Sequence, residues 1–587
     1  MKEKLKEIWG KADDIIFRYP MILTMALIAG ISSVVAIEID HQENQFLVVK
    51  FVMTACLGIS LMFAAKMLSQ RIGKEFLLQV LGLGILAIFY FVLPSSEKDF
   101  SEVYAFVLVP SYVLSHLLVS FVAFFGEGRE FNFWQYNKNL FINIFLTAVF
   151  TGVLVGGVML AILAVDKLFD LNFNDSLYPK TFFFLAILGS CFIFLLFNDK
   201  GLPQLEKDGS YPQILKFFTQ FVLIPLLLIY VVILYFYFGK ILINWELPRG
   251  WVSYLILAYS IVGILALLLV HPLKADSTKS WVRIFNKVFY YSLVPLLVML
   301  FIAIFTRILE YGYTEARYYV LLLAIWLTTV VFYFIFFKKS TIKFVPVSLF
   351  VFGLFAMIFP YFNAFSVAKE SQKNELEKIL VKNNLLANGK INFSKEVSLE
   401  VAEEIANKFN FLYKRYEENY LYSFLNQDKT KQIKKHETPL NYREIYSNVL
   451  GFFKYKVPSP STNNRIELYA PTVLVNIEGY KYISKIQEAT INGININGDK
   501  ITIKNALYSD NQKLTVTLNN NQSVDLMPFI KKKTAEYSPQ NTRITVDEIS
   551  TEFDLGKYHI KFLFDNLTRE KINNDRYYFG DAIILIK

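Results

Sequence analysis

A short polar segment between two long apolar stretches carries the side chains best placed for chemistry. Its charged and phenolic members are Arg307, Glu310, Tyr311, Glu315 and Arg317. Arg307 and Glu310 are three residues apart, a spacing at which opposite charges can pair on a helix. One interpretation is a polar site that binds a ligand, a lipid headgroup or the C-terminal region of the chain. The other is a structural ion-pair clasp that fixes a tight helical hairpin, with Gly312 supplying a permissive backbone.

A single histidine lies in the middle of an apolar segment. His116 has Ser111, Ser115 and Ser120 near it in the sequence. An ionisable residue within a membrane span is by default a candidate functional group. The structural alternative is a neutral imidazole that is hydrogen-bonded to a hydroxyl or carbonyl group of another helix, and both interpretations stay open.

Two acidic residues follow the first apolar segment. Glu38 and Asp40 lie in a short connection that ends at Gln45. Membrane glycosyltransferases that use polyprenyl-linked donors place an acidic catalytic group at a comparable position, where it can act as a general base. Those enzymes usually build their pocket from a much larger loop, so a solvated acidic loop is the alternative interpretation.

The common signatures of nucleotide binding, hydrolysis and metal binding are missing from the sequence. It has no Walker loop, no G-x-S-x-G, no C-x-x-C and no H-E-x-x-H. The histidines are scattered without metal-ligand spacing. Cys56 and Cys191 fall inside apolar segments, where a cysteine is usually a small core residue. We therefore predict no metal site, no cofactor and a non-enzymatic protein.

The apolar elements that must position these side chains dominate the composition. Of 587 residues, 54% are hydrophobic and 19% are charged, against about 45–50% and about 25% in soluble domains. This composition excludes a disulfide-stapled secreted scaffold, a disordered chain and a collagen-like fibre. Eleven segments have the roughly 20 mostly apolar residues that a membrane-spanning helix needs. They run near 19–37, 46–65, 76–93, 103–125, 140–165, 181–197, 214–238, 251–270, 288–306, 318–337 and 344–362.

The basic residues predict the orientation of this bundle. Nineteen Lys and Arg residues lie in the N-terminus and in every second connection, whereas seven lie in the other connections. Because positive charge gathers on the cytoplasmic side of membrane proteins, we expect a cytoplasmic N-terminus. An odd number of spans then places the C-terminal region outside the cytoplasm. The net charge of +10 reflects this bias rather than nucleic-acid binding, and residues 1–18 are expected to lie on the cytoplasmic membrane face as an amphipathic helix.

The composition changes abruptly after the last apolar segment. Apolar residues recur at helical spacing in 366–386 and 397–425, and Asn388-Gly389 marks a turn between these segments. The sequence therefore predicts a helical region over 363–456, which follows the transmembrane bundle of 19–362.

The last part of the chain, 457–587, has a different period. After a Pro-Ser cluster its apolar residues alternate with polar ones, and turn signals occur at Asn492-Gly493 and Asn497-Gly498. We expect a small antiparallel β domain there. The predicted fold is thus an α-helical polytopic membrane bundle with a C-terminal extracytoplasmic α+β region.

Several short motifs resemble those of one bacterial membrane family. The central motif runs from Arg307 to Tyr318 and matches the pattern R-I-x-x-Y-G-x-T-x-x-R-Y. Further likeness lies in Leu247–Ser253, His271–Leu273 and Asn384–Ile391. Over roughly 210–425 the chain resembles the family called domain of unknown function 4153. The resemblance implies a multipass inner-membrane protein, and it carries over no catalytic residues.

These features predict an envelope scaffold, docking or sensing protein whose partners are the lipid bilayer and an envelope protein that binds the C-terminal module. A transporter or flippase-like carrier is the first alternative. Its path would use discontinuous helices near Pro110, Pro225 and Pro295, together with His116 and a fifth span in which Gly152 and Gly156 are spaced for close helix contact. A membrane glycosyltransferase-like enzyme is the second alternative.

Overall fold

The chain forms two compact units. A computed structural model describes residues 2–39, 42–126, 129–207, 213–244, 251–271, 280–434, 442–456, 464–470, 475–486, 493–505, 512–519, 521–537, 543–571 and 575–587. The first unit comprises Met1–Phe393 and Glu403–Phe452, and the second comprises Ser394–Ala402 and Phe453–Lys587. Asp40, Asn492 and the Pro-Ser cluster of 457–462 lie outside the described residues.

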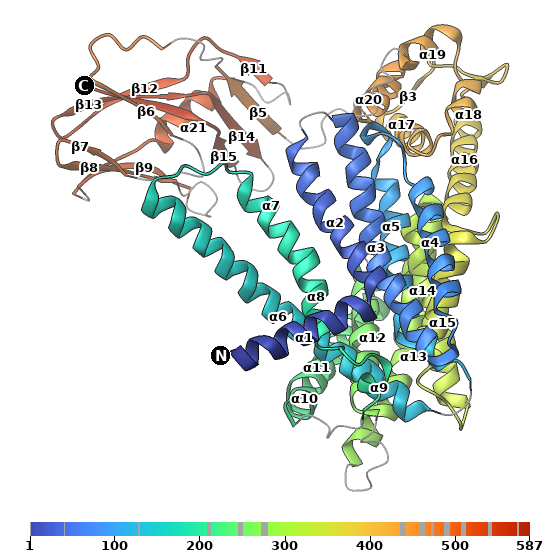
Figure 1. The fold of residues 1–587 in the computed structure, drawn as a ribbon. Coiled ribbons are helices and arrows are strands. Elements are labelled where there is room, and N and C mark those ends of the chain that lie inside the picture. Colours follow the sequence, from blue (N-terminus) through green and yellow to red (C-terminus); the bar gives the residue numbers. More distant parts are fainter. Residues whose placement is uncertain are drawn as a thin grey trace. The chain divides into compact units, whose positions relative to one another are not determined.

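The first unit begins with a series of mostly apolar helices (Figure 1). They are α1 (Lys2–Arg18), α2 (Pro20–Glu38), α3 (Gln42–Ile72), α4 (Glu75–Val92), α5 (Ala105–Phe121), α6 (Glu130–Phe169), α7 (Leu177–Phe184), α8 (Ser190–Leu196), α9 (Leu202–Leu205), α10 (Gln213–Phe218), α11 (Ile224–Asn244), α12 (Trp251–Leu269), α13 (Ser280–Tyr311), α14 (Glu315–Phe336) and α15 (Phe344–Ile358). Within the described residues, ten helical segments are long and apolar enough to cross a membrane. The chain is therefore an integral membrane protein.

The last of the eleven predicted spans is shorter than expected. All eleven are helical, but α15 has only 15 residues, fewer than the roughly 20 that cross a bilayer without distortion. The helix stops because Phe359, which directly precedes Pro360, adopts an extended conformation. Proline disfavours the helical conformation of the residue before it.

Two hydrophobic cores hold the bundle together. One includes Tyr19, Met67 and Leu195 and joins the helices before α10. The other includes Phe289 and Leu296 and joins α11 to α15. Large apolar side chains also cover the outer faces of the helices, as an integral membrane protein requires where its helices meet lipid chains.

Close packing at glycine occurs at positions other than those the sequence suggests. A Cβ atom added at Gly152 or Gly156 of α6 would meet nothing within 4 Å, so the predicted close contact of this helix is wrong for the described structure. A Cβ atom at Gly263 would instead overlap the ring of Phe289, and one at Gly58 would come within 2.8 Å of Met25. Glycine spacing does not tell which face of a helix meets a neighbour.

The helices with central prolines are continuous. α5 runs through Pro110 and α13 runs through Pro295, so the predicted interruptions at these residues are wrong. Neighbouring helices and small local adjustments can satisfy the backbone groups that a proline leaves free. At the third predicted proline, Pro225, helix α11 directly follows the π-helical turn η5 (Thr219–Leu223), and another π-helical turn, η4 (Leu185–Gly189), joins α7 to α8.

The loops rich in Lys and Arg meet at one end of the bundle. Arg71, in the last turn of α3, forms an ion pair with Glu206, which follows α9. Glu130, at the start of α6, accepts a hydrogen bond from the N–H of Ile342, before α15, at 3.0 Å. These contacts connect loops that are far apart in the sequence. The loop between α13 and α14 lies at the opposite end (Figure 1).

A group of polar helices, here called the helical cap, covers part of that opposite end (Figure 1). It consists of α16 (Ala364–Lys382), β1 (Leu386–Ala387), β2 (Lys390–Ile391), α17 (Leu399–Tyr413) from Glu403 onward, α18 (Glu418–Ser423), α19 (Gln427–Lys434) and α20 (Tyr442–Phe452). Asn363 begins α16 by accepting the N–H of Ser366 at 2.9 Å, as N-cap residues do. Asn388 and Gly389 have φ angles of 49° and 75° and join β1 to β2, which confirms the predicted turn.

Strands dominate the second unit. They are β3 (Glu396–Ser398), β4 (Lys454–Lys456), β5 (Asn464–Tyr469), β6 (Tyr482–Ile486), β7 (Ile494–Ile496), β8 (Asp499–Asn505), β9 (Leu514–Leu518), β10 (Gln522–Asp525), β11 (Arg543–Thr545), β12 (Ser550–Leu555), β13 (Tyr558–Phe564), β14 (Asn566–Lys571), β15 (Asp575–Phe579) and β16 (Ala582–Ile586). Three sheets have the strand orders β11-β5-β14-β15, β12-β13-β16-β6 and β10-β9-β8-β7. Helix α21 (Met527–Ala535) joins their common core, in which Phe562 and Phe564 are fully buried.

The sheets are antiparallel with two exceptions. The predicted turn at Asn497-Gly498 is confirmed, because both residues have positive φ between the paired strands β7 and β8. The pairs β11–β5 and β3–β4 are parallel. An alternating pattern has the same period in either direction, so the sequence pattern could not reveal these two pairs.

Candidate functional site

Glu315, the first residue of α14, is the deeply buried charge of the predicted polar cluster. Its exposed fraction is 1%. Its carboxylate accepts two hydrogen bonds from Arg415, which follows α17: Nε donates to Oε1 at 2.6 Å, and Nη2 donates to Oε2 at 2.7 Å. Two parallel charge-assisted bonds are the strongest arrangement for this pair of groups. The pair ties the helical cap to the start of a membrane helix.

A buried lysine makes a second connection between cap and bundle. Lys408 of α17 donates to the carbonyl oxygen of Tyr311 at 2.9 Å and to Oε1 of Gln372 at 2.8 Å. Gln372 of α16 in turn donates to the carbonyls of Tyr311 and Tyr313 at 2.9 and 2.7 Å. Burial lowers the pKa of Lys408, because a low-dielectric environment disfavours the charged form.

The close approach of α16 requires a glycine in the hairpin loop. Gly312 has a φ of 75°, and a Cβ atom there would lie 2.9 Å from Gln372 Nε2 and Glu375 Cγ. The next N–H, that of Tyr313, donates to Ser371 Oγ at 2.8 Å. Gly312 therefore serves both the backbone conformation and the contact with the cap.

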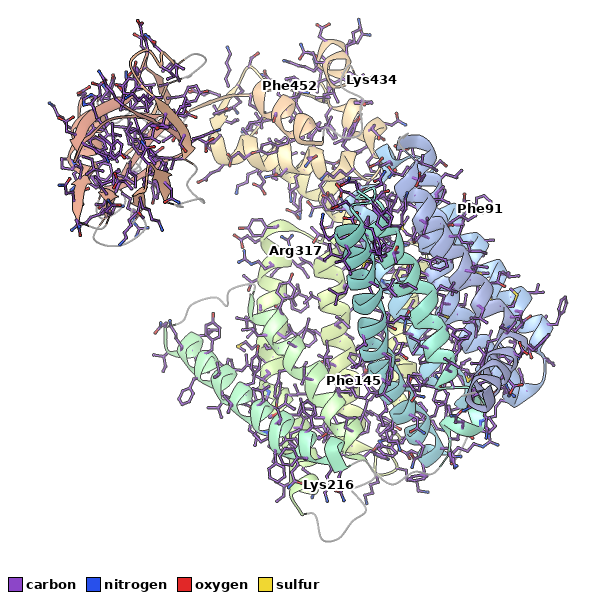
Figure 2. All side chains as sticks on the ribbon, turned by 60° about the vertical axis from the view of Figure 1, so that its left-hand side comes forward. Phe91, Phe145, Lys216, Arg317, Lys434 and Phe452 are labelled. Atoms are coloured by element: carbon purple, nitrogen blue, oxygen red, sulfur yellow. The ribbon has the colours of Figure 1, made fainter. Side chains whose placement is uncertain are left out.

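The predicted members of the cluster divide into two groups. Glu315 and the carbonyl of Tyr311 contact the cap, as described above. Arg307 and Glu310 pair weakly at 4.0 Å with side chains that are 42% and 53% exposed. Arg317, labelled in Figure 2, donates to a loop carbonyl at 2.7 Å and lies over the Tyr311 ring, 5.4 Å from its centroid. Ligand binding by the cluster stays a prediction.

More charged side chains surround this junction. Lys414 pairs with Glu102 of the 3-10 turn η2 (Glu102–Tyr104) at 2.5 Å. Glu417 accepts hydrogen bonds from both Lys369 and Lys373 of α16, at 2.9 and 2.7 Å. Burial raises the pKa of Glu417, but the hydrogen bonds from the two lysines outweigh burial and lower it. The carboxylate of Glu417 is thus shared by two ammonium groups of α16.

An apolar cavity of about 630 Å³ adjoins these cations. Leu61 of α3, Phe89 of α4 and Leu114 of α5 form part of its wall, and α15 completes it. Its polar lining consists of Tyr104, Ser111, Ser115, Lys369, Lys414, Arg415 and Tyr416. The volume falls within the range of about 300–1,000 Å³ that is usual for small-molecule sites. The arrangement combines an apolar interior with a cationic end.

The predicted intramembrane histidine does not line this cavity. His116 is exposed on α5, and its Nδ1 lies 2.8 Å from the carbonyl oxygen of Tyr112 in the same helix. The neighbouring Ser115 is buried and shares a hydrogen bond of 2.7 Å with Ser60 of α3. The contact between helices that the sequence suggests for His116 is thus made by Ser115.

The acidic connection after the first span also lies apart from the cavity lining. Glu38 is exposed and forms an ion pair with Lys180 of α7. Asp40 belongs to the part of the chain outside the described residues. Across the described residues, no group of three or more His, Cys, Asp or Glu side chains is arranged to hold a metal ion.

Several residues of the junction escape sequence reasoning, although two of them leave a signal. Gln372 falls in line with Ala368 and Leu376 on the buried face of α16, and Lys408 falls in line with Ile405 on that of α17. A polar residue that interrupts an apolar helical stripe must find a buried hydrogen-bond partner. No comparable pattern distinguishes Arg415 from the other charged residues of the tail.

Comparison with known proteins gives the chain a family. The family model described as Domain of unknown function (DUF4153) matches residues 21–388. The chain belongs to this family. An uncharacterised protein, PM1469, of Pasteurella multocida (strain Pm70) is 30% identical over 220 residues, which are 36% of this chain and 36% of the relative. The chain thus spans about a third of the length of that curated relative. No solved structure matches.

The DUF4153 match covers one side of the cap–bundle junction. It includes Glu315 and Gln372, whereas Lys408 and Arg415 lie beyond its end. The match also begins far before the motifs at 210–425 that first indicate the family, and it takes in nearly all of the membrane helices. The family therefore comprises the bundle and α16 (Ala364–Lys382).

Proposed function

We propose that this DUF4153 protein is a non-enzymatic docking or sensing protein of the bacterial inner membrane. In this proposal the N-terminus and the basic loops lie in the cytoplasm, and the helical cap and the second unit lie outside it. The excess of Lys and Arg in alternate loops supports this orientation. The bundle then serves as the anchor, and the second unit, with a hydrophobic core of its own, serves as the docking module.

An exposed apolar strand edge in the second unit carries the docking proposal. β6 is an edge strand, because among the described strands of its sheet it pairs with β16 alone. Its residues Tyr482 and Ile483 are 40% and 56% exposed. An edge strand presents backbone N–H and C=O groups that can pair with another chain. We expect an extended segment of an envelope protein to bind there by strand addition.

The opposite edge of the same sheet is protected by charge. β12 carries the exposed residues Glu552 and Asp554. His559 of the adjacent β13 pairs with Asp554 at 2.6 Å. Charged residues on an edge strand discourage pairing with other chains. β6 also carries an exposed charge, Lys485, but it is paired with Asp581 at 2.7 Å, and we therefore infer that β6 is the docking edge.

Site-specific photo-crosslinking of the full chain in cells tests this proposal. A photoreactive amino acid at Ile483 should give a discrete crosslinked partner, and the same group at Glu552 should not. Equal products from both positions, or repeated absence of a product from Ile483, would count against docking at β6.

A flippase-like carrier is the second candidate, and the apolar cavity favours it. Ser111 and Ser115 are the polar side chains that α5 contributes to the cavity wall. A carrier in reconstituted vesicles should accelerate the transfer of a fluorescent phospholipid between leaflets. If the protein only docks a partner, vesicles that contain it should transfer the lipid at the same rate as protein-free vesicles. Because Glu38 pairs with Lys180 outside the cavity lining, the transferase alternative gains no support from the cavity.

A further inference from the structure

The apolar cavity is open on the side of two membrane helices. Ile88 of α4 and Ile358 of α15 line it and are 67% and 66% exposed. Phe91 on the same helix as Ile88 is 81% exposed and lies at the outside of the bundle (Figure 2). In an integral membrane protein such apolar outer faces meet lipid chains. The cavity therefore opens toward acyl chains rather than toward water.

The end of the cavity at the helical cap carries an excess of positive charge. Three cationic side chains, Lys369, Lys414 and Arg415, line this end, and among the described residues no Asp or Glu side chain lines the cavity. Arg415 is committed to the buried carboxylate of Glu315. Lys414 is only 13% exposed, whereas the side chain of its partner Glu102 is 69% exposed. Lys414 and Lys369 are therefore the cations that can share an anion at the cavity end.

The position of this end along the chain matches the depth of lipid headgroups. Tyr361 and Phe362, between α15 and α16, are 85% and 60% exposed. Aromatic residues at the ends of membrane helices lie at the level of the headgroups. Lys369 follows in α16 and lines the cavity from the same end.

We propose that this cavity binds an anionic glycerophospholipid from the surrounding leaflet. One acyl chain occupies the space between α4, α5 and α15, and the phosphate is shared by Lys369 and Lys414. The open apolar side admits the chain, and the excess positive charge selects the anionic headgroup. The cavity belongs to the first unit and β6 belongs to the second, and the test of this proposal does not depend on the proposed function.

Native mass spectrometry of the full chain in detergent measures the binding directly. The probes are phosphatidylglycerol and phosphatidylcholine with identical acyl chains. We expect phosphatidylglycerol to bind about tenfold more tightly, the size of one charge-assisted contact. Glycerol phosphate, which has no acyl chain, should not displace the bound lipid. Equal affinity for the two lipids, or displacement by glycerol phosphate, would overturn the proposal.

Substitutions separate the two halves of the site. The double variant K369Q/K414Q should lower the affinity for phosphatidylglycerol to that for phosphatidylcholine. The matched control is Lys378→Gln, because Lys378 is on the same helix, pairs with Glu375 and does not line the cavity. This control should keep the preference. A preference that survives in K369Q/K414Q, or that is lost equally in K378Q, would contradict the assigned headgroup site.

Photolabelling locates the acyl chain without relying on a variant. A phosphatidylglycerol with a diazirine at the end of one acyl chain should label peptides from 85–92 and 350–358, the cavity-lining parts of α4 and α15. Ser111→Phe, which fills the cavity, should abolish this labelling while K378Q leaves it unchanged. Labelling spread evenly over the exposed face of α6 would refute the cavity as the binding site.

Discussion

Glu315→Gln is the substitution that tests the junction between bundle and cap most sharply. The variant keeps the size of the side chain and removes its charge. Arg415, whose side chain is only 8% exposed, would then be a buried cation without its carboxylate. Removing one partner of a buried ion pair costs about 3–5 kcal/mol, because the remaining charge is neither solvated nor paired.

This cost should appear as a weaker attachment of the helical cap. If the cap opens locally, about 3 kcal/mol raises the open fraction more than about a hundredfold, since about 1.4 kcal/mol corresponds to a factor of ten. Amide hydrogen exchange of the full chain in detergent measures this opening. We expect faster exchange in α17 and α18 and unchanged exchange in the central turns of α12.

Glu310→Gln is the matched control in the same hairpin. Glu310 is 53% exposed and lies 4.0 Å from Arg307, and exposed pairs contribute only about 0–1 kcal/mol. Its variant should leave cap exchange nearly unchanged. If Glu315→Gln accelerated exchange no more than Glu310→Gln does, the buried pair would not hold the cap, and the argument from burial would be refuted.

Three further predictions concern the loop, the cap and the second unit. Gly312→Ala should lower the free energy of unfolding by about 1–3 kcal/mol. The loss should exceed that of Gly389→Ala, because Gly389 has the same φ of 75° but an added Cβ atom there would meet open space. Thermal unfolding compares the two variants, and equal losses would contradict the contact with α16. Glu417 has a lowered pKa, so its stabilisation is present above its ordinary pKa of 4.5 and lost as the pH falls through the folded value; thermal unfolding from pH 3 to 7 should show this loss, and Glu417→Gln should remove the step. The hydrogen bond from Lys557 lowers the pKa of Asp499 from 3.8 to about 2, so the second unit should lose stability as the pH falls through this interval; an Asp499→Asn variant with the same acid sensitivity would count against this contact.

The membrane helices follow from the sequence because their signal is local. A run of apolar residues is sufficient to predict a span, and each of the eleven predicted segments is helical. The length of α15 depends on Pro360 as well as on hydropathy, and the helix therefore ends at Ile358. That Gly152 faces open space could not be predicted in the same way, because it depends on the position of every other helix.

The junction was predictable only in part for a similar reason. The hairpin charges form a visible cluster, and Gln372 and Lys408 interrupt apolar stripes. Arg415 lies 100 residues after Glu315, and neither position alone indicates the other. The pair exists because α16 and α17 fold back onto the loop, which is a tertiary contact without a local signature.

The docking proposal requires that the second unit lie outside the cytoplasm, and labelling of single cysteines measures this directly. Lys587→Cys and Lys207→Cys would be compared in spheroplasts with a membrane-impermeant maleimide. The parent chain, whose Cys56 and Cys191 lie within the bundle, gives the background. We expect labelling at position 587 in intact spheroplasts and at position 207 only after lysis. Protection of position 587 until lysis would contradict the account.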